Sequence, residues 1–223
     1  MSSSKLPRLI GSALGFLFYQ SAMAGIISLY DESRIITFSN GHKTYGHYAA
    51  HNELFYCEFF FMSDGPVHDS DKTIPIQTFD LNYRKNKYTY SRRESDSSIQ
   101  GALTKQGSAI TITTENPRGG CQSAAGLFSD GGVPYTEVKR IAGLGFGVAT
   151  RKTVIYINPD EIKKRGYLLA GDTVAVIKQK NNYSYVRYVN PDMLIEDDDK
   201  RHITTGWVRS TDLVDPFPPA GKQ

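Results

Sequence analysis

The feature that most constrains the fold is the apolar run LFYCEFFFM at residues 54–62, the most apolar segment after residue 24. Successive side chains of a strand point to opposite faces of a sheet, so a run this dense places apolar groups on both faces. Such a strand must be buried on both sides or face a partner. The run predicts a strand across residues 53–62 that is covered on both faces.

Strand patterns also dominate the remainder of residues 25–140. β-branched and aromatic residues recur at 26–30 and 35–38, and residues 109–114 (AITITT) alternate strictly. Residues 63–72 are polar and predict a loop. Roughly seven to nine short strands with almost no helical period predict an all-β domain, either an antiparallel barrel or a sandwich.

The first 24 residues have the pattern of a secretory signal peptide. Lys5 and Arg8 give a positive start, residues 9–19 are apolar, and Ala22 and Ala24 are small residues before a cleavage site. The apolar run is shorter than the roughly 20 residues that span a bilayer. We expect cleavage after Ala24, a periplasmic or secreted location, and no membrane span in the mature chain.

Cys57 and Cys121 are the two cysteines of the chain. Because the signal predicts export to an oxidising compartment, we expect them to form a disulfide. The formal net charge of +3 falls to about +1 when the two cations of the signal segment are subtracted. So small an excess gives no basis for nucleic-acid binding.

Glycines at positions 143, 145 and 147 interrupt the strand pattern, and we interpret residues 143–152 as a linker. It divides the chain into a disulfide-closed β-domain at 25–142 and a second β-domain at 153–215, followed by a flexible tail at 216–223. Spaced glycines also occur in phosphate-binding loops, but those lie between a strand and a helix, whereas Arg151 leads into another strand. We expect no cofactor.

Several short motifs in the second domain form a set. They are Tyr156 with Asn158-Pro159-Asp160, Tyr167-Leu168 with Gly171-Asp172, Val186-Arg187-Tyr188, and Gly206-Trp207 with Asp212-Leu213. As a set they resemble bacterial SH3 domains. The resemblance implies a small SH3-like β-barrel and, in exported bacterial proteins, binding to cell-wall peptides or to proteins that act on the wall.

The local chemistry agrees with this resemblance. Gly171 supplies the positive φ that a turn requires, and Asp172 supplies a side-chain acceptor for the amides of the turn. Alternation predicts a set of inward-facing residues, namely Val174, Val176, Val186 and Tyr188. We interpret Trp207 as a core residue.

Two features depart from the SH3 pattern. Tyr183 and Tyr185 stand where many members have Gly-Trp, and the loop before the last strand is enlarged to residues 191–202. The four consecutive acids at 196–199 repel one another and lack the alternation of a calcium loop, so we expect a solvated tip.

The order of features in the first domain carries a second resemblance. Gly46 and Tyr48 precede the cysteine strand, and Gly119-Gly120-Cys121 precedes a final strand. This order is similar to that of the small periplasmic barrels that inhibit lysozymes. The similarity covers the domain as a pattern and assigns no individual residue.

Three histidines, His42, His47 and His51, lie within ten positions. On a strand, His47 and His51 share a face with Glu53, which suits zinc or copper, but a fourth ligand is missing. We therefore expect loop or surface histidines and no metal. No G-x-S-x-G motif is present, and the disulfide leaves no Cys-His pair, so we expect no enzyme activity.

Aromatic residues exceed what the strands need for a core, with 14 Tyr and 11 Phe. Tyr and Trp dominate interface hot spots, so part of this excess predicts a binding surface. The candidate binding residues are Tyr183, Tyr185, Tyr156, Tyr167, Asp69 and Asp71.

These observations favour an exported, non-catalytic protein that binds or inhibits a cell-wall-associated protein such as a peptidoglycan hydrolase. In that inhibitor or immunity role, the loop at 63–72 would plug a cleft. Two alternatives are a targeting or scaffold subunit that binds peptidoglycan peptides, and a cell-wall hydrolase.

Overall fold

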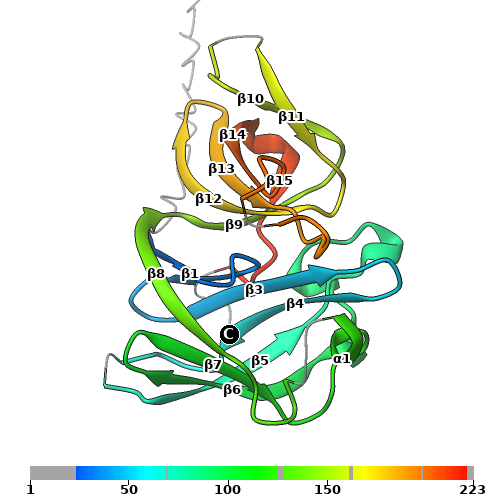
Figure 1. Cartoon of the computed structure of the whole chain (residues 1–223). Coiled ribbons are helices and arrows are strands. Elements are labelled where there is room, and N and C mark those ends of the chain that lie inside the picture. Colours follow the sequence, from blue (N-terminus) through cyan, green and yellow to red (C-terminus); the bar gives the residue numbers. More distant parts are fainter. Residues whose placement is uncertain (1–23, 69, 125–127, 161–162, 197, 220–223) are drawn as a thin grey trace, which may run out of the picture.

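The computed structural model of the protein describes residues 24–68, 70–124, 128–160, 163–196 and 198–219. The chain forms a closed barrel and a seven-stranded sheet that pack against each other (Figure 1). The predicted all-β class is confirmed, and the first domain is the barrel rather than the sandwich. The predicted signal segment lies outside the described residues, except for Ala24.

The barrel has eight antiparallel strands in sequence order. They are β1 (Gly25–Tyr30), β2 (Ile35–Ser39), β3 (Thr44–His51), β4 (Tyr56–Ser63), β5 (Thr73–Phe79), β6 (Ile99–Gln106), β7 (Ala109–Thr114) and β8 (Pro134–Gly143). β1 pairs with β8 and closes the barrel, so both edges of each strand are paired. The predicted loop at 63–72 connects β4 and β5.

The second sheet has the strand order β11-β10-β14-β13-β12-β9-β15. Its strands are β9 (Gly145–Ala149), β10 (Thr153–Tyr156), β11 (Lys164–Leu168), β12 (Thr173–Lys180), β13 (Tyr183–Val189), β14 (Ile203–Arg209) and β15 (Leu213–Val214). The described helices are short: α1 (Cys121–Ala124) and the 3-10 turns η1 (Tyr83–Lys85), η2 (Tyr90–Arg92), η3 (Ser95–Ser97) and η4 (Ser210–Asp212). Within the described ranges, a helix capable of crossing a membrane is not found.

The dense apolar run forms β4 only from Tyr56 onwards, and its apolar side chains from Cys57 to Met62 are buried on both faces as predicted. The prediction is wrong for the start of the run, because Leu54, Phe55 and Tyr56 are exposed. Phe59 and Phe61 point into the barrel and are fully buried there with Cys57. Phe60 and Met62 point outwards and are buried against the second sheet. The second layer that the run requires is therefore supplied by the chain itself.

An apolar cluster joins the barrel to the second sheet. It contains Phe38, Phe60 and Phe79 from the barrel side and Phe146 and Ala175 from the second sheet. At about 25 cal/mol per Å² of apolar surface removed from water, a contact of this kind is a main source of stability. The two sheets therefore share a core instead of being joined only by the chain.

The C-terminal segment completes that cluster. Phe217 is 7% exposed, and its ring lies 4.8 Å from that of Tyr45 and 5.7 Å from that of Phe60. The prediction of a flexible tail at 216–223 is wrong for its described part, because this ring fills the space between the sheets. Residues 220–223 lie outside the described residues.

The segment interpreted as a linker, residues 143–152, instead contains β9, which pairs with β12 and β15. Its glycines allow close packing rather than flexibility. A Cβ at Gly143 would overlap the Ile27 side chain, and one at Gly147 would lie 3.2 Å from Leu213. β8 therefore runs almost directly into the second sheet.

The predicted disulfide links Cys57 of β4 to Cys121 of α1. It closes a loop of 64 residues, which in the chain-entropy model stabilises the fold by about 4 kcal/mol. Both cysteines are buried in the barrel core, so the disulfide is part of the packing.

The core of the second sheet follows the predicted alternation. Val174, Val176 and Val186 are buried together, and Tyr188 packs against them. Gly171 has a φ of 98°, and Asp172 accepts a hydrogen bond of 2.7 Å from the Leu169 amide, as predicted for this turn.

The fit of Gly46 against Phe61 provides a test of the barrel. The two residues are paired across β3 and β4, and a Cβ at Gly46 would overlap the fully buried Phe61 ring. We expect Gly46→Ala to lower the free energy of unfolding by about 3 kcal/mol, measured in urea. Gly166→Ala is the control, because no atom lies within 4 Å of its added Cβ; equal losses in both variants would contradict this packing.

Candidate functional site

A polar cluster lies on the outer face of β3 and β4, between the barrel and the second sheet. Oε1 of Glu58 lies 3.1 Å from Nε2 of His47 and accepts a hydrogen bond of 2.7 Å from the Tyr83 hydroxyl. Oε2 of Glu58 lies 3.4 Å from Nε2 of His51. Glu58 pairs with Ala49 across the two strands, which places its carboxylate between the two histidines.

This environment keeps Glu58 charged. Burial alone raises the pKa of its carboxyl, but the hydrogen bonds with His47, His51 and Tyr83 outweigh burial and lower the pKa to about 2. Burial, followed by the charge of Glu58, raises the pKa of Tyr83 well above its usual value. At neutral pH, Glu58 is thus an anion and Tyr83 a neutral donor.

The structure changes the predicted histidine group. His42 lies exposed in the β2–β3 turn, and Glu53 is exposed in the β3–β4 loop. Glu58, not Glu53, is the acid that His47 and His51 contact. Over the ranges that the structure describes, no three His, Cys, Asp or Glu side chains are placed to hold a metal ion.

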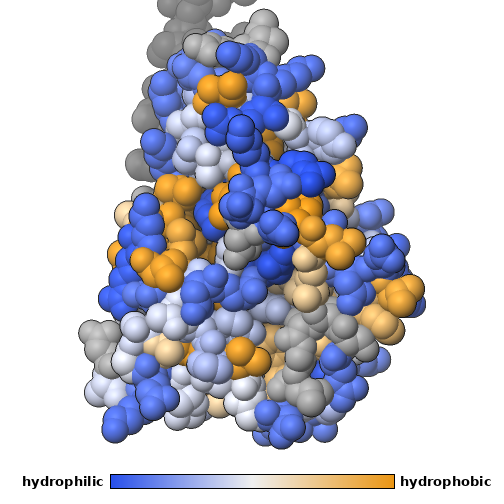
Figure 2. Space-filling model, in the orientation of Figure 1, coloured by the Kyte–Doolittle hydropathy of each residue, from blue (hydrophilic) through white to orange (hydrophobic). Residues whose placement is uncertain are grey.

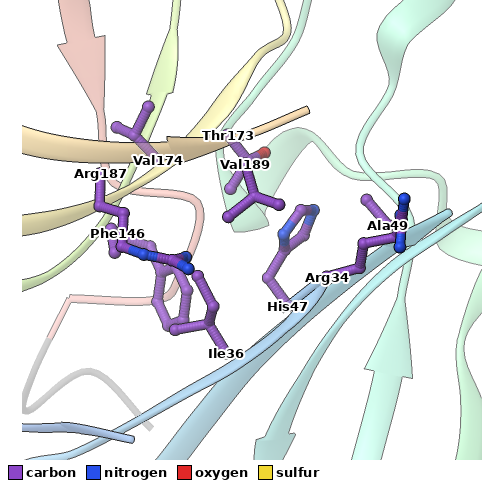
Figure 3. Close-up of a pocket in the computed structure, with 10 residues that line it drawn as sticks. Arg34, Ile36, His47, Ala49, Phe146, Thr173, Val174, Arg187 and Val189 are labelled. Atoms are coloured by element: carbon purple, nitrogen blue, oxygen red, sulfur yellow. The ribbon is translucent and has the colours of Figure 1, made fainter. Parts of the chain in front are cut away.

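A small cavity adjoins this polar cluster (Figure 3). Its walls come from both sheets and include Arg34, Ile36 and His47 on the barrel side and Phe146, Thr173 and Arg187 on the other. Its volume is about 20 Å³, enough for a group about the size of one water molecule. The cavity is too small for an organic substrate.

Three of the predicted tyrosines come together on the second sheet, where they form an aromatic row with Trp207. Tyr156 of β10 pairs with Trp207 of β14, which in turn pairs with Tyr185 of β13. The rings of Tyr185 and Trp207 are 5.2 Å apart, and Tyr183 lies 6.1 Å from Tyr156. All four residues of this aromatic row are partly exposed.

The interpretation of Trp207 as a core residue is wrong. Successive residues of β14 alternate between the two faces, and Val208 occupies the inward position with no exposed surface. Trp207 therefore points to the opposite face, beside Tyr185.

Lysines flank the aromatic row. Nζ of Lys178 lies 5.2 Å from the ring centre of Tyr185 and 5.6 Å from that of Trp207. The fourth predicted tyrosine, Tyr167, is 56% exposed on β11, with Nζ of Lys152 4.2 Å from its ring centre. These distances permit cation–π attraction, and Lys178 places a positive charge beside the row.

Of the two predicted aspartates, Asp71 belongs to the barrel and not to the aromatic row. Asp71 accepts a hydrogen bond of 2.7 Å from the His68 amide and so stabilises the β4–β5 loop. Asp69 lies outside the described residues.

Two loops from different domains meet beside the polar cluster. The His51 amide donates to the Pro191 carbonyl at 2.7 Å, and the Met193 amide donates to the His51 carbonyl at 2.8 Å. Arg34 of the barrel donates to the carbonyls of Asp192 and Ile195. The enlarged loop at 191–202 thus connects the second sheet to the barrel.

The prediction that the acids at 196–199 form a solvated tip is confirmed in part. Glu196 and Asp198 are exposed, while residue 197 lies outside the described residues. Ile195 and His202, however, are buried, and the His202 ring is hydrogen-bonded to the Ser33 hydroxyl. Only the tip is solvated, because both ends of the loop pack on the barrel.

Exposed apolar side chains gather where these loops meet. We call this set the loop surface; it consists of Leu54, Phe55, Tyr56, Met193 and Leu194, of which Leu54 and Leu194 are 79% and 69% exposed. Figure 2 shows apolar residues on the side of the molecule where the two loops lie. Large exposed apolar groups that cluster in this way are typical of interaction surfaces.

Sequence reasoning missed Tyr83 and Arg187 as site residues. One signal was available for Arg187: if Val186 and Tyr188 face the core, Arg187 faces the other way, with Tyr185. The pattern does not show that the barrel covers this part of the face. Tyr83 lies in a short 3-10 turn and has no local signal.

The comparisons with known proteins identified no relative. No protein family model matches the chain, and neither a curated protein nor a solved structure is significantly similar to it.

The charge of Glu58 makes stability depend on pH. Its pKa in the folded chain is lowered from 4.5 to about 2, so its contribution is fully present above pH 4.5 and is lost as the pH falls towards 2. We expect a loss on the order of 3 kcal/mol over this window. Glu58→Gln should be less stable than the wild type at pH 7 and decline less steeply below pH 4.5 in urea unfolding.

Glu53→Gln is the control for this prediction, because Glu53 is exposed in the β3–β4 loop. Its stability should follow that of the wild type across the whole pH range. If Glu58→Gln declined as steeply in acid as the wild type, the charged cluster would not be the cause of the pH dependence.

Proposed function

We propose that this protein is an exported, non-catalytic binding protein that contacts its ligand through the aromatic row of the second sheet. The ligand is a cell-wall-associated protein such as a peptidoglycan hydrolase, and the role is inhibition or immunity.

The aromatic row is the observation that supports this function best. Tyr and Trp are enriched in interface hot spots, where large rings bury apolar area and still offer a polar group. The four rings stand on adjacent, paired strands and form two ring pairs, Tyr156 with Tyr183 and Tyr185 with Trp207, so binding costs them little conformational freedom. A rigid, partly exposed aromatic surface of this kind suits a protein or peptide ligand.

The loop surface is a second argument for a protein ligand. Leu54 and Phe55 lie in the β3–β4 loop of the barrel. Met193 and Leu194 lie in the 191–202 loop of the second domain, which is hydrogen-bonded to His51 at the end of β3. A ligand that touched this surface would contact both domains at once. That arrangement fits a folded partner better than a short peptide.

The type of the second domain and the location of the protein are part of the same proposal. The motif set at 153–215 supports an SH3-like second domain, and the pattern of the first 24 residues supports export to the periplasm. In exported bacterial proteins, the resemblance to bacterial SH3 domains implies ligands of the cell wall.

Direct binding to peptidoglycan peptides is the second candidate function. It is favoured by Lys178 and Lys152, which lie over the rings of Tyr185 and Tyr167. The peptide stems of the wall carry carboxylates, and lysines at the rim of an aromatic surface would attract them.

Inhibition assays test the proposed function. The purified protein should slow the digestion of isolated sacculi when mixed in stoichiometric amounts with one enzyme from a panel of muramidases, amidases and endopeptidases. The double variant Tyr185→Ala/Trp207→Ala should raise the concentration needed for half-inhibition by at least about tenfold, because each ring is an expected hot spot. Release of soluble wall fragments is the readout.

Val138→Ala is the matched control, because Val138 is 64% exposed on the barrel strand β8; it should inhibit like the wild type. Sedimentation of the protein with sacculi, abolished by the double variant and without inhibition, would support the targeting candidate instead. Neither inhibition nor sedimentation would overturn both, and digestion of sacculi by the protein alone would show that it is an enzyme.

A further inference from the structure

Arg187 is a buried cation without a counterion in the described part of the chain. Its side chain is 8% exposed, and no described residue accepts a hydrogen bond from its Nη1. Burial lowers the pKa of its guanidinium, and no acidic neighbour acts against that effect. Because an unpaired buried charge costs several kcal/mol, an anion is expected beside it.

Arg118 is a second buried arginine, and its partners can be compared with those of Arg187. It is 5% exposed in the barrel, donates to the Thr78 hydroxyl at 2.6 Å, and forms an ion pair with Asp80. Its guanidinium also lies 4.9 Å from the ring centre of Phe59. Arg118 thus has a counterion and a hydrogen-bond acceptor, and Arg187 has neither among the described residues.

The cavity lined by Arg187 has the other properties of an anion site. Figure 3 shows the Arg187 side chain extending from β13 towards Ile36 of the barrel, with the His47 ring rising from β3 beside it. Thr173, which also lines the cavity, faces the Tyr83 hydroxyl of the polar cluster. The Arg187 guanidinium can donate to an anion placed in the cavity.

The charges around the cavity also favour an anion. Arg34 is a second cation on its wall. Glu58, the acid nearest to His47, does not line the cavity, and its two oxygens are already engaged by His47, His51 and Tyr83. Ile36 and Phe146 supply apolar walls, which strengthen electrostatic attraction by excluding water.

We propose that this cavity binds a monatomic halide, chloride in the natural setting, beside the Arg187 guanidinium. Size decides between anions. About 20 Å³ admits one group close to water in size, and chloride fits that description, whereas phosphate and sulfate carry four oxygens around a central atom. Chloride also accepts hydrogen bonds from any direction.

The site exists only when the two sheets are packed together, because its walls come from both. A ligand that binds the folded and not the unfolded chain stabilises the folded state in proportion to the logarithm of its concentration. Chloride is therefore expected to stabilise the contact between the domains. This inference is independent of the ligand of the aromatic row.

Thermal unfolding at constant ionic strength tests the chloride site. Sodium gluconate replaces sodium chloride in the reference buffer, because gluconate is too large for the cavity. We expect the Tm of the full chain to rise by about 3 °C when 300 mM gluconate is exchanged for chloride. Arg187→Met should show no such rise, and Val138→Ala should respond like the wild type. A wild type indifferent to the exchange, or an Arg187→Met variant with an equal rise, would overturn the site.

Bromide gives a second test that requires no variant. Crystals of the wild-type protein grown with sodium bromide should show an anomalous-scattering peak in this cavity, within hydrogen-bond distance of the Arg187 guanidinium. An ordered crystal with bromide peaks elsewhere and none in this cavity would overturn the proposal. This test remains decisive even if Arg187→Met does not fold.

Discussion

The double burial of β4 is the constraint on which the rest of the structure depends. Its inward side chains, Phe59 and Phe61, fill the barrel, and its outward ones, Phe60 and Met62, require a second layer. In most closed barrels the outer face can be polar, but here it cannot. The second sheet, including β9, and the segment around Phe217 pack where that outer face must be covered, so the two domains share one packed apolar cluster.

Because the second sheet covers β3 and β4, polar groups on these strands are buried in the contact. The chain compensates Glu58 with two histidines and a tyrosine, and it compensates Arg34 with Glu32 and two carbonyl groups of the 191–202 loop. A buried charge without such partners stands out against this background. Arg187 is that charge, and its position between the sheets links ion binding to the packing of the domains.

Much of the fold could be predicted because its signals are local. Alternation and turn chemistry suffice for the strands, for the inward set around Val174 and for the turn at Gly171, and two cysteines in a chain expected to be exported suffice for the disulfide. The errors have a common physical origin. Glycines at 143–147 are compatible with a flexible linker or with close packing against a neighbouring segment. Phe217 is compatible with a flexible tail or with a buried ring, depending on which residues pack against it. That information comes from tertiary contacts, which one sequence does not reveal.

The residues of the candidate site could likewise be predicted from the sequence only where their signals are local. Tyr156, Tyr183 and Tyr185 were found because they belong to a recognisable motif region, and strand pairing then brought them together with Trp207. The sequence suggested Glu53 as the acid beside the histidines, whereas the register of β3 and β4 brings Glu58 to them. The cavity has no sequence signature, because its walls come from strands of two domains that are far apart in the sequence.

The position of Phe217 has a consequence for the order of assembly. Every other ring that it touches, from Tyr45 to Phe146, precedes it in the chain and is made before it. The barrel and most of the second sheet can therefore form while the gap between them still lacks its last aromatic ring. Synthesis in the N-to-C direction delivers that ring after all of these partners, so the aromatic cluster between the domains can close only once the rings of both sheets have been made.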